Sequence, residues 1–472
     1  MTPKSCIPVL PLLLLCGCLE YPSDRLVSLP DFQDTLPKNN IAALVKMKCM
    51  TLADARKFAL AGNPDYRSAQ HAVSVAKYRY YQSLSAYLPE VNFHASAGQS
   101  IRNSHDLLNP PAGIMPWENR FSSQFGLTAS LLVFDGLERE FTMLAARQER
   151  RRSEALDRNA KRLLLQAVAF AYYDAVLARE QERIAAADLS FQKSSLAQAE
   201  NQYRNGLVSK AAVLNFRILA NAARSAILNA RYRGTAARNS LAALMGFPRE
   251  DLPPQLELDC RLPDDQEVIP SLESCLEQAA ANRPDLRAAV LLLDIASFRK
   301  WSAYSGFLPM IRAGTGFGFT AETARYGGYS VNRSHHNTTD FSYGVSGEWN
   351  LFKGFSTFNL IREQTVRQEL ARFHMEDVFL KAVTEVKDAY ANYLNARGQA
   401  RIYRETVGWV FEQRTLVQSE FWCGRETITR LNGAQSDLVE AESRLAIARI
   451  ELLKAIIQLS AAAAMPESGE EW

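Results

Sequence analysis

The chain has 472 residues, with 54 Lys and Arg against 51 Asp and Glu and a formal net charge of +3. So balanced a charge argues against a nucleic-acid-binding protein, which needs a basic surface for the phosphates. The chain also lacks any apolar run of about 18 residues or more, so we expect any membrane-spanning segment to be a β-strand.

The N-terminus is typical of a secretory signal, because Lys4 precedes an apolar run over 7–15. The run ends in Leu15-Cys16-Gly17-Cys18, which resembles a bacterial lipobox with a small residue before the acceptor cysteine. Cleavage before Cys18 would leave a diacylated N-terminus, and two acyl chains suffice for stable anchoring. Leu19 is not the aspartate that retains bacterial lipoproteins at the inner membrane. An ordinary signal peptide is the alternative.

Four further cysteines would reside in an oxidising compartment if the chain is exported. Four cysteines allow three pairings, among them Cys260 with Cys275, or Cys49 with either of these. Free thiols, including that of Cys423, are the alternative.

From residue 51 the sequence predicts helices and strands in turn. Residues 18–50 contain prolines without strong periodicity and predict an extended segment. Thr51 is a suitable N-cap for a helix that continues to about residue 87, with a break at Asn63-Pro64-Asp65. The segment 137–204 has no proline or glycine, and as one helix it would reach roughly 100 Å. Another helix is expected over 209–245.

The same order of landmarks returns in the second half of the chain. Arg283-Pro284-Asp285 lies 220 residues after the first proline break, and Gly424 lies 218 residues after Gly206. Self-similarity over so many landmarks indicates a duplication, and the period is too long for a solenoid. We therefore expect a signal peptide over 1–17, an extended segment over 18–50, a first repeat over 51–250, a linker over 251–270, a second repeat over 271–464 and a tail over 465–472.

Each repeat also contains two runs in which apolar and polar side chains alternate. Alternation over about ten residues is typical of a transmembrane β-strand. The polar stretches between the runs, 102–120 and 320–340, would then face the outside of the cell. For one run alone, a soluble sheet with one wet face is the alternative, but four symmetrically placed runs behind a secretory signal favour the membrane. These strands are predicted at about 90–101, 121–134, 310–320 and 341–352.

Four strands per copy cannot close a barrel, and an open edge in lipid leaves backbone groups unsatisfied. Two copies would give an eight-stranded barrel filled by its own side chains, whereas three copies give about 12 strands and room for a pore. The two shorter helices of each repeat together match the long one, so they can stack end to end beside it, with a belt of linker and termini halfway along. The predicted fold is an internally duplicated α+β membrane protein, with four transmembrane β-strands and long α-helical hairpins per protomer in a trimeric 12-stranded β-barrel with a periplasmic α-barrel.

These features together resemble the TolC-like outer-membrane efflux factor family, in its lipidated branch. They are the helix opening at 52–66 and its repeat at 272–286, Leu88-Pro89 and Leu308-Pro309, Phe134-Asp135-Gly136, and the turn at 203–209. The resemblance implies a homotrimeric outer-membrane exit duct that passively conducts small molecules and extends into the periplasm. A periplasmic adaptor protein and an inner-membrane transporter are the implied partners, besides outer-membrane lipid.

The resemblance also implies which residues carry the function. Family adaptors dock on the two helical hairpin tips, here Gly206, Leu207, Val208 and Ser209, and Gly424, Arg425, Glu426 and Thr427. Helix-turn geometry alone would also explain the two glycines. Where the family often has an acidic residue just inside the tips, this chain has Ala212 and Arg430. We therefore expect Glu426 and Arg430, with Arg425, to form a substitute periplasmic gate of opposite charges.

Other chemistry is sparse in the sequence. No catalytic constellation appears, so we expect no enzyme, no cofactor and no metal site. His335-His336 is expected in a solvated outer loop, with metal capture as the alternative. The duct of a type I protein secretion system would look nearly the same as an efflux duct, and a non-conducting periplasmic coiled-coil scaffold is the alternative from another class.

Overall fold

A computed structural model describes residues 47–103, 117–247, 256–258, 271–326 and 332–465. Cys18, Cys260 and most of the linker and the C-terminal tail lie outside these residues. None of the described helices combines the length and the apolar character needed to cross a membrane.

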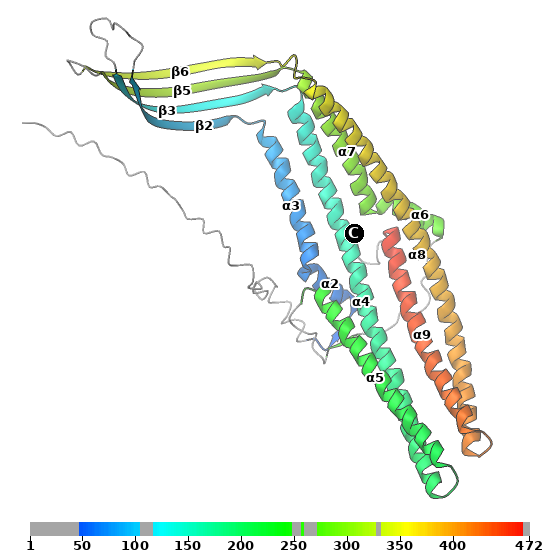
Figure 1. The fold of residues 1–472 in the computed structure, drawn as a ribbon. Coiled ribbons are helices and arrows are strands. Elements are labelled where there is room, and N and C mark those ends of the chain that lie inside the picture. Colours follow the sequence, from blue (N-terminus) through cyan, green and yellow to red (C-terminus); the bar gives the residue numbers. More distant parts are fainter. Residues whose placement is uncertain (1–46, 104–116, 248–255, 259–270, 327–331, 466–472) are drawn as a thin grey trace, which may run out of the picture. The chain divides into compact units, whose positions relative to one another are not determined.

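The first repeat consists of helices and strands that begin and end close to the predicted residues (Figure 1). Thr51 caps the first helix, since its hydroxyl accepts from the Asp54 N–H while the Asp54 carboxylate accepts from the Thr51 N–H. Gly136 at φ +70° and Leu137 at φ +70° turn the chain from the second strand into the longest helix. The elements are α2 (Leu52–Gly62), α3 (Pro64–Ser85), β2 (Glu90–Asn103), β3 (Trp117–Phe134), α4 (Glu138–Arg204) and α5 (Lys210–Leu244).

The second repeat has the same order of elements, and the predicted duplication is visible in their lengths. Its long helix has 67 residues, as α4 has. Gly354 and Phe355, with φ of +57° and +63°, make the same left-handed entry into it. The elements are α6 (Leu272–Asn282), α7 (Pro284–Tyr304), η3 (Ser305–Phe307), β5 (Met310–Tyr326), β6 (Asn332–Glu348), α8 (Ser356–Trp422) and α9 (Ile428–Ala463).

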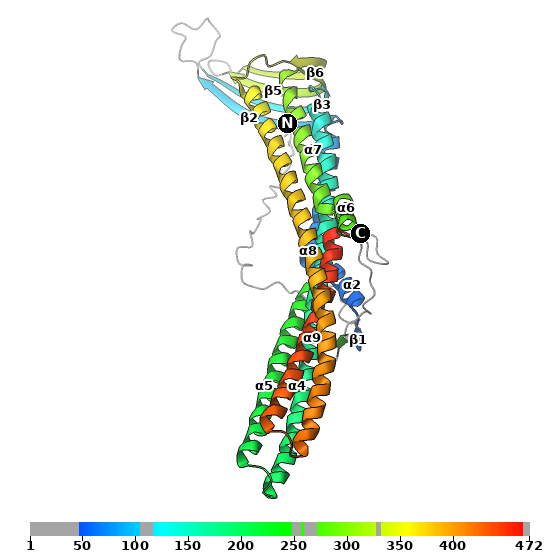
Figure 2. The same ribbon diagram turned by 90° about the vertical axis from the view of Figure 1, so that its right-hand side faces the viewer.

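Four strands form one antiparallel sheet in the order β2-β3-β5-β6. The helices repeat this row of four. Beside the sheet the order is α3-α4-α7-α8, and farther from it the order is α5-α4-α9-α8 (Figures 1 and 2). At each level the first-repeat element β2, α3 or α5 lies at one edge, and β6 or α8 lies at the other.

A small belt lies against the middle of α4. Here β1 (Cys49–Met50) pairs in parallel with β4 (Glu257–Leu258), so the N-terminal segment and the linker meet as expected. The Tyr172 hydroxyl of α4 donates to the Met50 carbonyl oxygen at 3.0 Å. The Met50 side chain of β1 is fully buried.

Each strand runs beyond one of its predicted ends. The expected loop over 102–120 was wrong at its two ends, where β2 reaches Asn103 and β3 begins at Trp117. The expected loop over 320–340 was wrong over most of its length, where β5 reaches Tyr326 and β6 begins at Asn332. Both hairpins continue as paired strands beyond the residues whose side chains alternate between apolar and polar. Polar side chains of neighbouring strands contact one another along this part of the ladder, such as Arg120 with Glu322 at 3.4 Å and Gln99 with Asn119 at 2.8 Å. The alternation of apolar and polar side chains therefore ends before the sheet does.

The last strand ends earlier than predicted, at Glu348 instead of about residue 352. The next residue, Trp349, donates from its indole N–H to the Phe307 carbonyl oxygen at 3.0 Å. This bond draws the chain from the sheet toward the end of η3, so Trp349 and Leu351 are outside the sheet.

Candidate functional site

The two hairpin tips have the same backbone. Gly206 and Gly424 have φ of +74° and +76°. In the first tip the Leu207 N–H donates to the Gln202 carbonyl at 2.9 Å, and in the second the Arg425 N–H donates to the Glu420 carbonyl at 2.9 Å. These are Schellman C-caps, which need a left-handed residue, so the glycines are required by the turn whatever else they do.

The helices that leave the tips are capped alike. The Ser209 hydroxyl accepts from the Ala212 N–H and the Thr427 hydroxyl accepts from the Arg430 N–H. Both tips therefore present two residues between a glycine and a hydroxyl cap. The first presents Leu207, which is 72% exposed, and Val208, whereas the second presents Arg425 and Glu426.

The expected gate residues Glu426 and Arg430 are close in the chain but do not pair within the protomer. The Glu426 carboxylate accepts from the Thr427 N–H at 3.3 Å. Within the described part of the chain, no ion pair joins Arg425, Glu426 and Arg430. A network of these charges would therefore have to form between copies.

Above the tips the two hairpins share a core. Phe216 of the first hairpin and Leu431 of the second are both fully buried in one apolar cluster with Val417. Next to it lies a polar layer, in which the Asp188 carboxylate accepts from Gln435 at 2.9 Å and from Gln192 at 3.2 Å. Both glutamine side chains are buried, and their carbonyl oxygens find no partner within the described residues.

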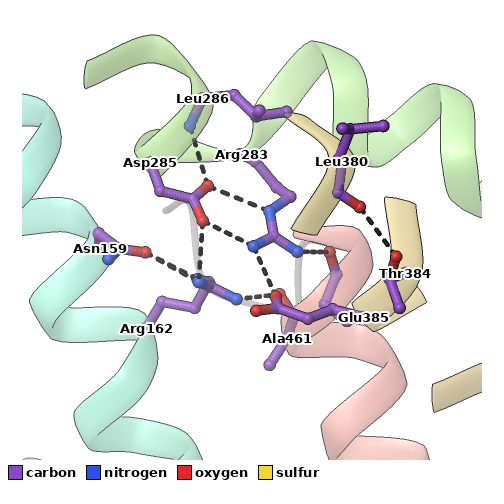
Figure 3. Close-up of polar contacts among 10 residues, drawn as sticks. Asn159, Arg162, Arg283, Asp285, Leu286, Leu380, Thr384, Glu385 and Ala461 are labelled. Carbon is purple, nitrogen blue, oxygen red and sulfur yellow. Dashed lines mark hydrogen bonds and ion pairs between the residues drawn. The ribbon is translucent and has the colours of Figure 1, made fainter. Parts of the chain in front are cut away.

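A charge cluster around two buried arginines joins α4, α7, α8 and α9 (Figure 3). Arg162 of α4 and Arg283 at the start of α7 are 5% and 3% exposed. Arg283 donates to Asp285 at 2.6 Å and to Glu385 of α8 at 2.7 Å. The two guanidinium groups also donate to the last carbonyl oxygens of α9, Arg162 to Ala461 at 2.8 Å and Arg283 to Ala462 at 3.1 Å.

The cluster shifts the titration of its own members. Burial lowers the pKa of the Arg162 guanidinium, and the positive charge of Arg283 lowers it further. Burial alone would raise the pKa of Asp285, but its hydrogen bond and charge contacts with Arg283 and Arg162 hold that pKa below its ordinary value. The amino-acid sequence alone did not indicate this cluster. Its only signal was arginine in the proline break at 283 where the first repeat has Asn63.

The sheet has one apolar and one polar face, as the alternation predicted. One row across all four strands consists of Phe93, Leu127, Phe317 and Phe341 in register. All four of these side chains are exposed in the protomer. One residue along, the row on the opposite face consists of the small or polar residues Asn92, Thr128, Gly316 and Ser342. A face of exposed large apolar side chains suits lipid.

The histidine pair does not lie in a loop as expected. His335 and His336 belong to β6, and Nδ1 of His335 lies 3.0 Å from the Thr323 hydroxyl. Within the described residues, no group of three or more His, Cys, Asp or Glu side chains is placed to hold a metal ion. Of the four cysteines, Cys49 and Cys423 are exposed free thiols, and Cys275 is buried.

The chain matches the outer membrane efflux protein family twice, over residues 56–247 and 275–464. The chain belongs to this family. It is an outer-membrane efflux channel with a periplasmic extension, as the resemblance in its sequence implied. Its relatives in the family are channel proteins, not enzymes.

Individual relatives agree with this membership. Over 388 residues the chain is 25% identical to outer membrane protein TolC of Vibrio cholerae, covering 80% of this chain and 82% of TolC. Over 304 residues it is 25% identical to the alkaline protease secretion protein AprF of Pseudomonas aeruginosa, covering 63% of this chain and 59% of AprF. The crystal structure of VceC from Vibrio cholerae is similar in fold, with a TM-score of 0.71 at 18% identity over 87% of this chain and 95% of VceC.

Proposed function

We propose that three copies of this chain form the exit duct of a tripartite efflux system. The observation that carries the proposal is the common row order of the three levels, which leaves one edge made of β2, α3 and α5 and another made of β6 and α8. An edge strand in lipid needs a partner for its backbone groups. Four strands from each of three copies close a 12-stranded barrel, and the helices continue the same ring as an α-barrel.

Exposed apolar stripes at the two edges support this assembly. On α5, Ile218 and Tyr232 are 67% and 76% exposed, and on α8, Trp409 is 68% exposed. Large apolar side chains in such rows are typical of helix faces that pack against a partner. When one edge of each copy binds the other edge of the next copy, the copies form a closed ring if the rotation between neighbours divides a full turn evenly.

The remaining parts of the proposal concern the ends of the duct. Lipidation of Cys18 after removal of residues 1–17 would anchor each copy in the outer membrane. The tips Gly206–Ser209 and Gly424–Thr427 would bind a periplasmic adaptor protein, which links the duct to an inner-membrane transporter. The exposed Leu207 and the charged pair Arg425 and Glu426 support a binding role beyond the turn itself. The two separate matches to the family support two duplicated halves, over 51–250 and 271–464.

We propose that the duct is passive and not an enzyme, and that its cargo consists of small molecules delivered by the transporter. Export of a protein by a type I secretion system is the second candidate, because the similarity to AprF extends over 304 residues. An ATP-driven exporter encoded beside this chain would favour secretion, and a proton-driven pump would favour efflux.

Planar-bilayer recording combined with mass measurement tests the proposal. The purified protein is expected to be a trimer with stable single-channel conductance. The double variant Ile218→Asp and Trp409→Asp places charge on both edges and is expected to abolish the trimer. Leu156→Asp is the matched control, since Leu156 is an exposed leucine of α4 in the middle of the row. A conducting monomer, or a trimer that survives the edge variant, would contradict the assembly.

A further inference from the structure

A cavity of about 680 Å³ lies where the helices meet the sheet. Its walls come from α4, α7 and the start of α8, with one residue of α3. Four cationic side chains line the cavity. Arg79 comes from α3, Arg299 from α7 and Arg367 from α8, and Lys353 lies just before α8. The carboxylates in its wall are Glu138 and Glu149 of α4.

The positive charge of the cavity is only partly neutralised. Arg367 pairs with Glu363 at 2.6 Å, and Glu149 pairs with Arg152 at 3.1 Å, so these two wall residues have partners outside it. Arg79, Arg299 and Lys353 have no carboxylate of the described residues within ion-pair distance, and only Glu138 opposes them. Each protomer therefore presents a surplus of positive charge in one hollow.

Helix geometry places the cavity and the belt on opposite faces of the row. Thr142 lines the cavity, and Arg151, nine residues on, lies about 180° round the helix axis. Tyr172 lies within about 60° of the Arg151 direction. Its hydroxyl donates to the Met50 carbonyl oxygen of β1, so the belt covers the Arg151 face of α4.

The belt decides which face is inside a closed ring. A second layer of segments on the inner face would obstruct the bore, so the belt has to lie outside. The cavity, on the opposite face, then opens into the bore. Trp301 of α7 agrees with this, because it is exposed about 200° round the axis from Arg299 and stacks on Phe141 near the ends of the helices that adjoin the sheet. Large aromatic side chains at such a position suit a membrane–water interface on the outer face.

We propose that this cavity, defined by Arg79, Arg299 and Lys353, is an anion-binding site in the wall of the duct that favours carboxylate- or phosphate-bearing cargo. It rests on the trimeric duct proposed above, which brings three such cavities to one level of the bore. Fixed charges that line a pore raise the local concentration of ions of the opposite sign. The guanidinium groups match planar carboxylates and phosphates, and the ammonium adds a point charge.

Reversal potentials across a potassium chloride gradient test the site. Replacing Arg79, Arg299 and Lys353 by Gln is expected to lower the chloride-to-potassium permeability ratio roughly three-fold. Arg151→Gln is the matched control, since Arg151 is an exposed arginine of the same region on the outer face, and its ratio is expected to stay at the wild-type value. Millimolar inorganic phosphate is expected to reduce chloride current in the wild type and not in the triple variant.

Charge restoration separates a local effect from a folding defect. Arg299→Cys is made with Cys49, Cys260 and Cys423 replaced by Ser, and Cys275 is buried and protected. A cationic methanethiosulfonate reagent is expected to restore the chloride-to-potassium permeability ratio, and an anionic reagent is expected to lower that ratio further. Absence of conductance in every variant and in the wild type would refute the duct itself. Normal conductance with an unchanged ratio and no effect of either reagent would refute the anion site alone.

Discussion

Asn63 and Arg283 occupy equivalent positions in the two repeats and make equivalent bonds. The Asn63 amide donates to the Leu244 carbonyl at 2.9 Å, and the Arg283 guanidinium donates to the Ala462 carbonyl at 3.1 Å. Each acceptor lies at the end of the helix that returns from a hairpin tip. One bond thus joins the break before a proline to the end of the returning helix in both halves.

The two residues differ in capping. The Asn63 side-chain oxygen accepts from the Tyr66 N–H at 3.0 Å, but arginine has no acceptor. In the second repeat the Asp285 carboxylate accepts from the Leu286 N–H at 2.9 Å instead, and Arg283 binds the same carboxylate. The charge cluster therefore compensates for a lost N-cap.

The first prediction concerns Arg283. Arg283→Ala removes the side-chain donor to the buried Ala462 carbonyl and the nearest charge partner of the Asp285 carboxylate, and we expect it to lower the free energy of unfolding by about 3 kcal/mol. Arg283→Asn restores the residue of the first repeat and is expected to cost about half as much, because the amide can cap the helix. Thermal unfolding followed by circular dichroism measures both. Equal losses would show that the first-repeat bond cannot form here.

The second prediction concerns acid. The pKa of Asp285 is lower in the folded chain than its ordinary value of 3.8, so its contribution to stability is present above that value and is lost as pH falls through the folded pKa. We expect Asp285→Asn to lower the melting temperature at pH 7 and to melt closer to the wild type near pH 3. A difference between the two proteins that does not depend on pH would contradict this.

The third prediction compares the two helix ends at Gly246 and Ala464. Gly246 has φ +84°, and a Cβ there would lie 2.3 Å from the Gly62 carbonyl oxygen. We expect Gly246→Ala to cost about 3 kcal/mol or more, because backbone must move. Ala464 is left-handed at φ +49°. In Ala464→Gly the relief of about 1–2 kcal/mol of strain opposes lost burial and added chain entropy, so the net change is expected to stay within about 0.5 kcal/mol. Denaturant midpoints measure both variants.

The fourth prediction concerns the gate. If Glu426 and Arg430 pair between copies at the periplasmic entrance, Glu426→Ala with Arg430→Ala is expected to raise single-channel conductance by roughly half. Glu440→Ala with Arg444→Ala is the control, since these residues form an i,i+4 pair farther along the same helix. Equal conductance of wild type and gate variant would mean that the two charges are solvated at the tip.

The fifth prediction concerns the polar layer between the hairpins. Asp188→Ala removes the acceptor of two buried glutamine amides, Gln192 and Gln435, so we expect the hairpins to separate more easily. Limited proteolysis near the tips is expected to become several-fold faster. Asp437→Ala is the control, since Asp437 is a carboxylate two residues beyond Gln435 that makes no hydrogen bond or ion pair with the described residues of the first hairpin. No change in cleavage rate would show that the apolar cluster alone joins the hairpins.

The order and the length of the helices could be predicted from the sequence because their signals are local. Proline breaks, glycines at C-caps and a long segment without either determine where a helix begins and ends. The strand ends could not be predicted in this way, because the strands stay paired beyond the alternating residues, where polar side chains such as Arg120 and Glu322 contact one another across strands. Such pairs depend on the register of residues about 200 positions apart.

By itself the amino-acid sequence determined the duplication, the two hairpin turns and the alternation of the four strands, since each of these depends on backbone preference and on neighbours within a few residues. Only the tertiary structure decided which elements lie at the edges, that Arg162, Arg283, Asp285 and Glu385 form one cluster, and that Arg79, Arg299 and Lys353 line one cavity. Charges from three or four helices meet through packing, and no local pattern in the chain encodes which faces will meet.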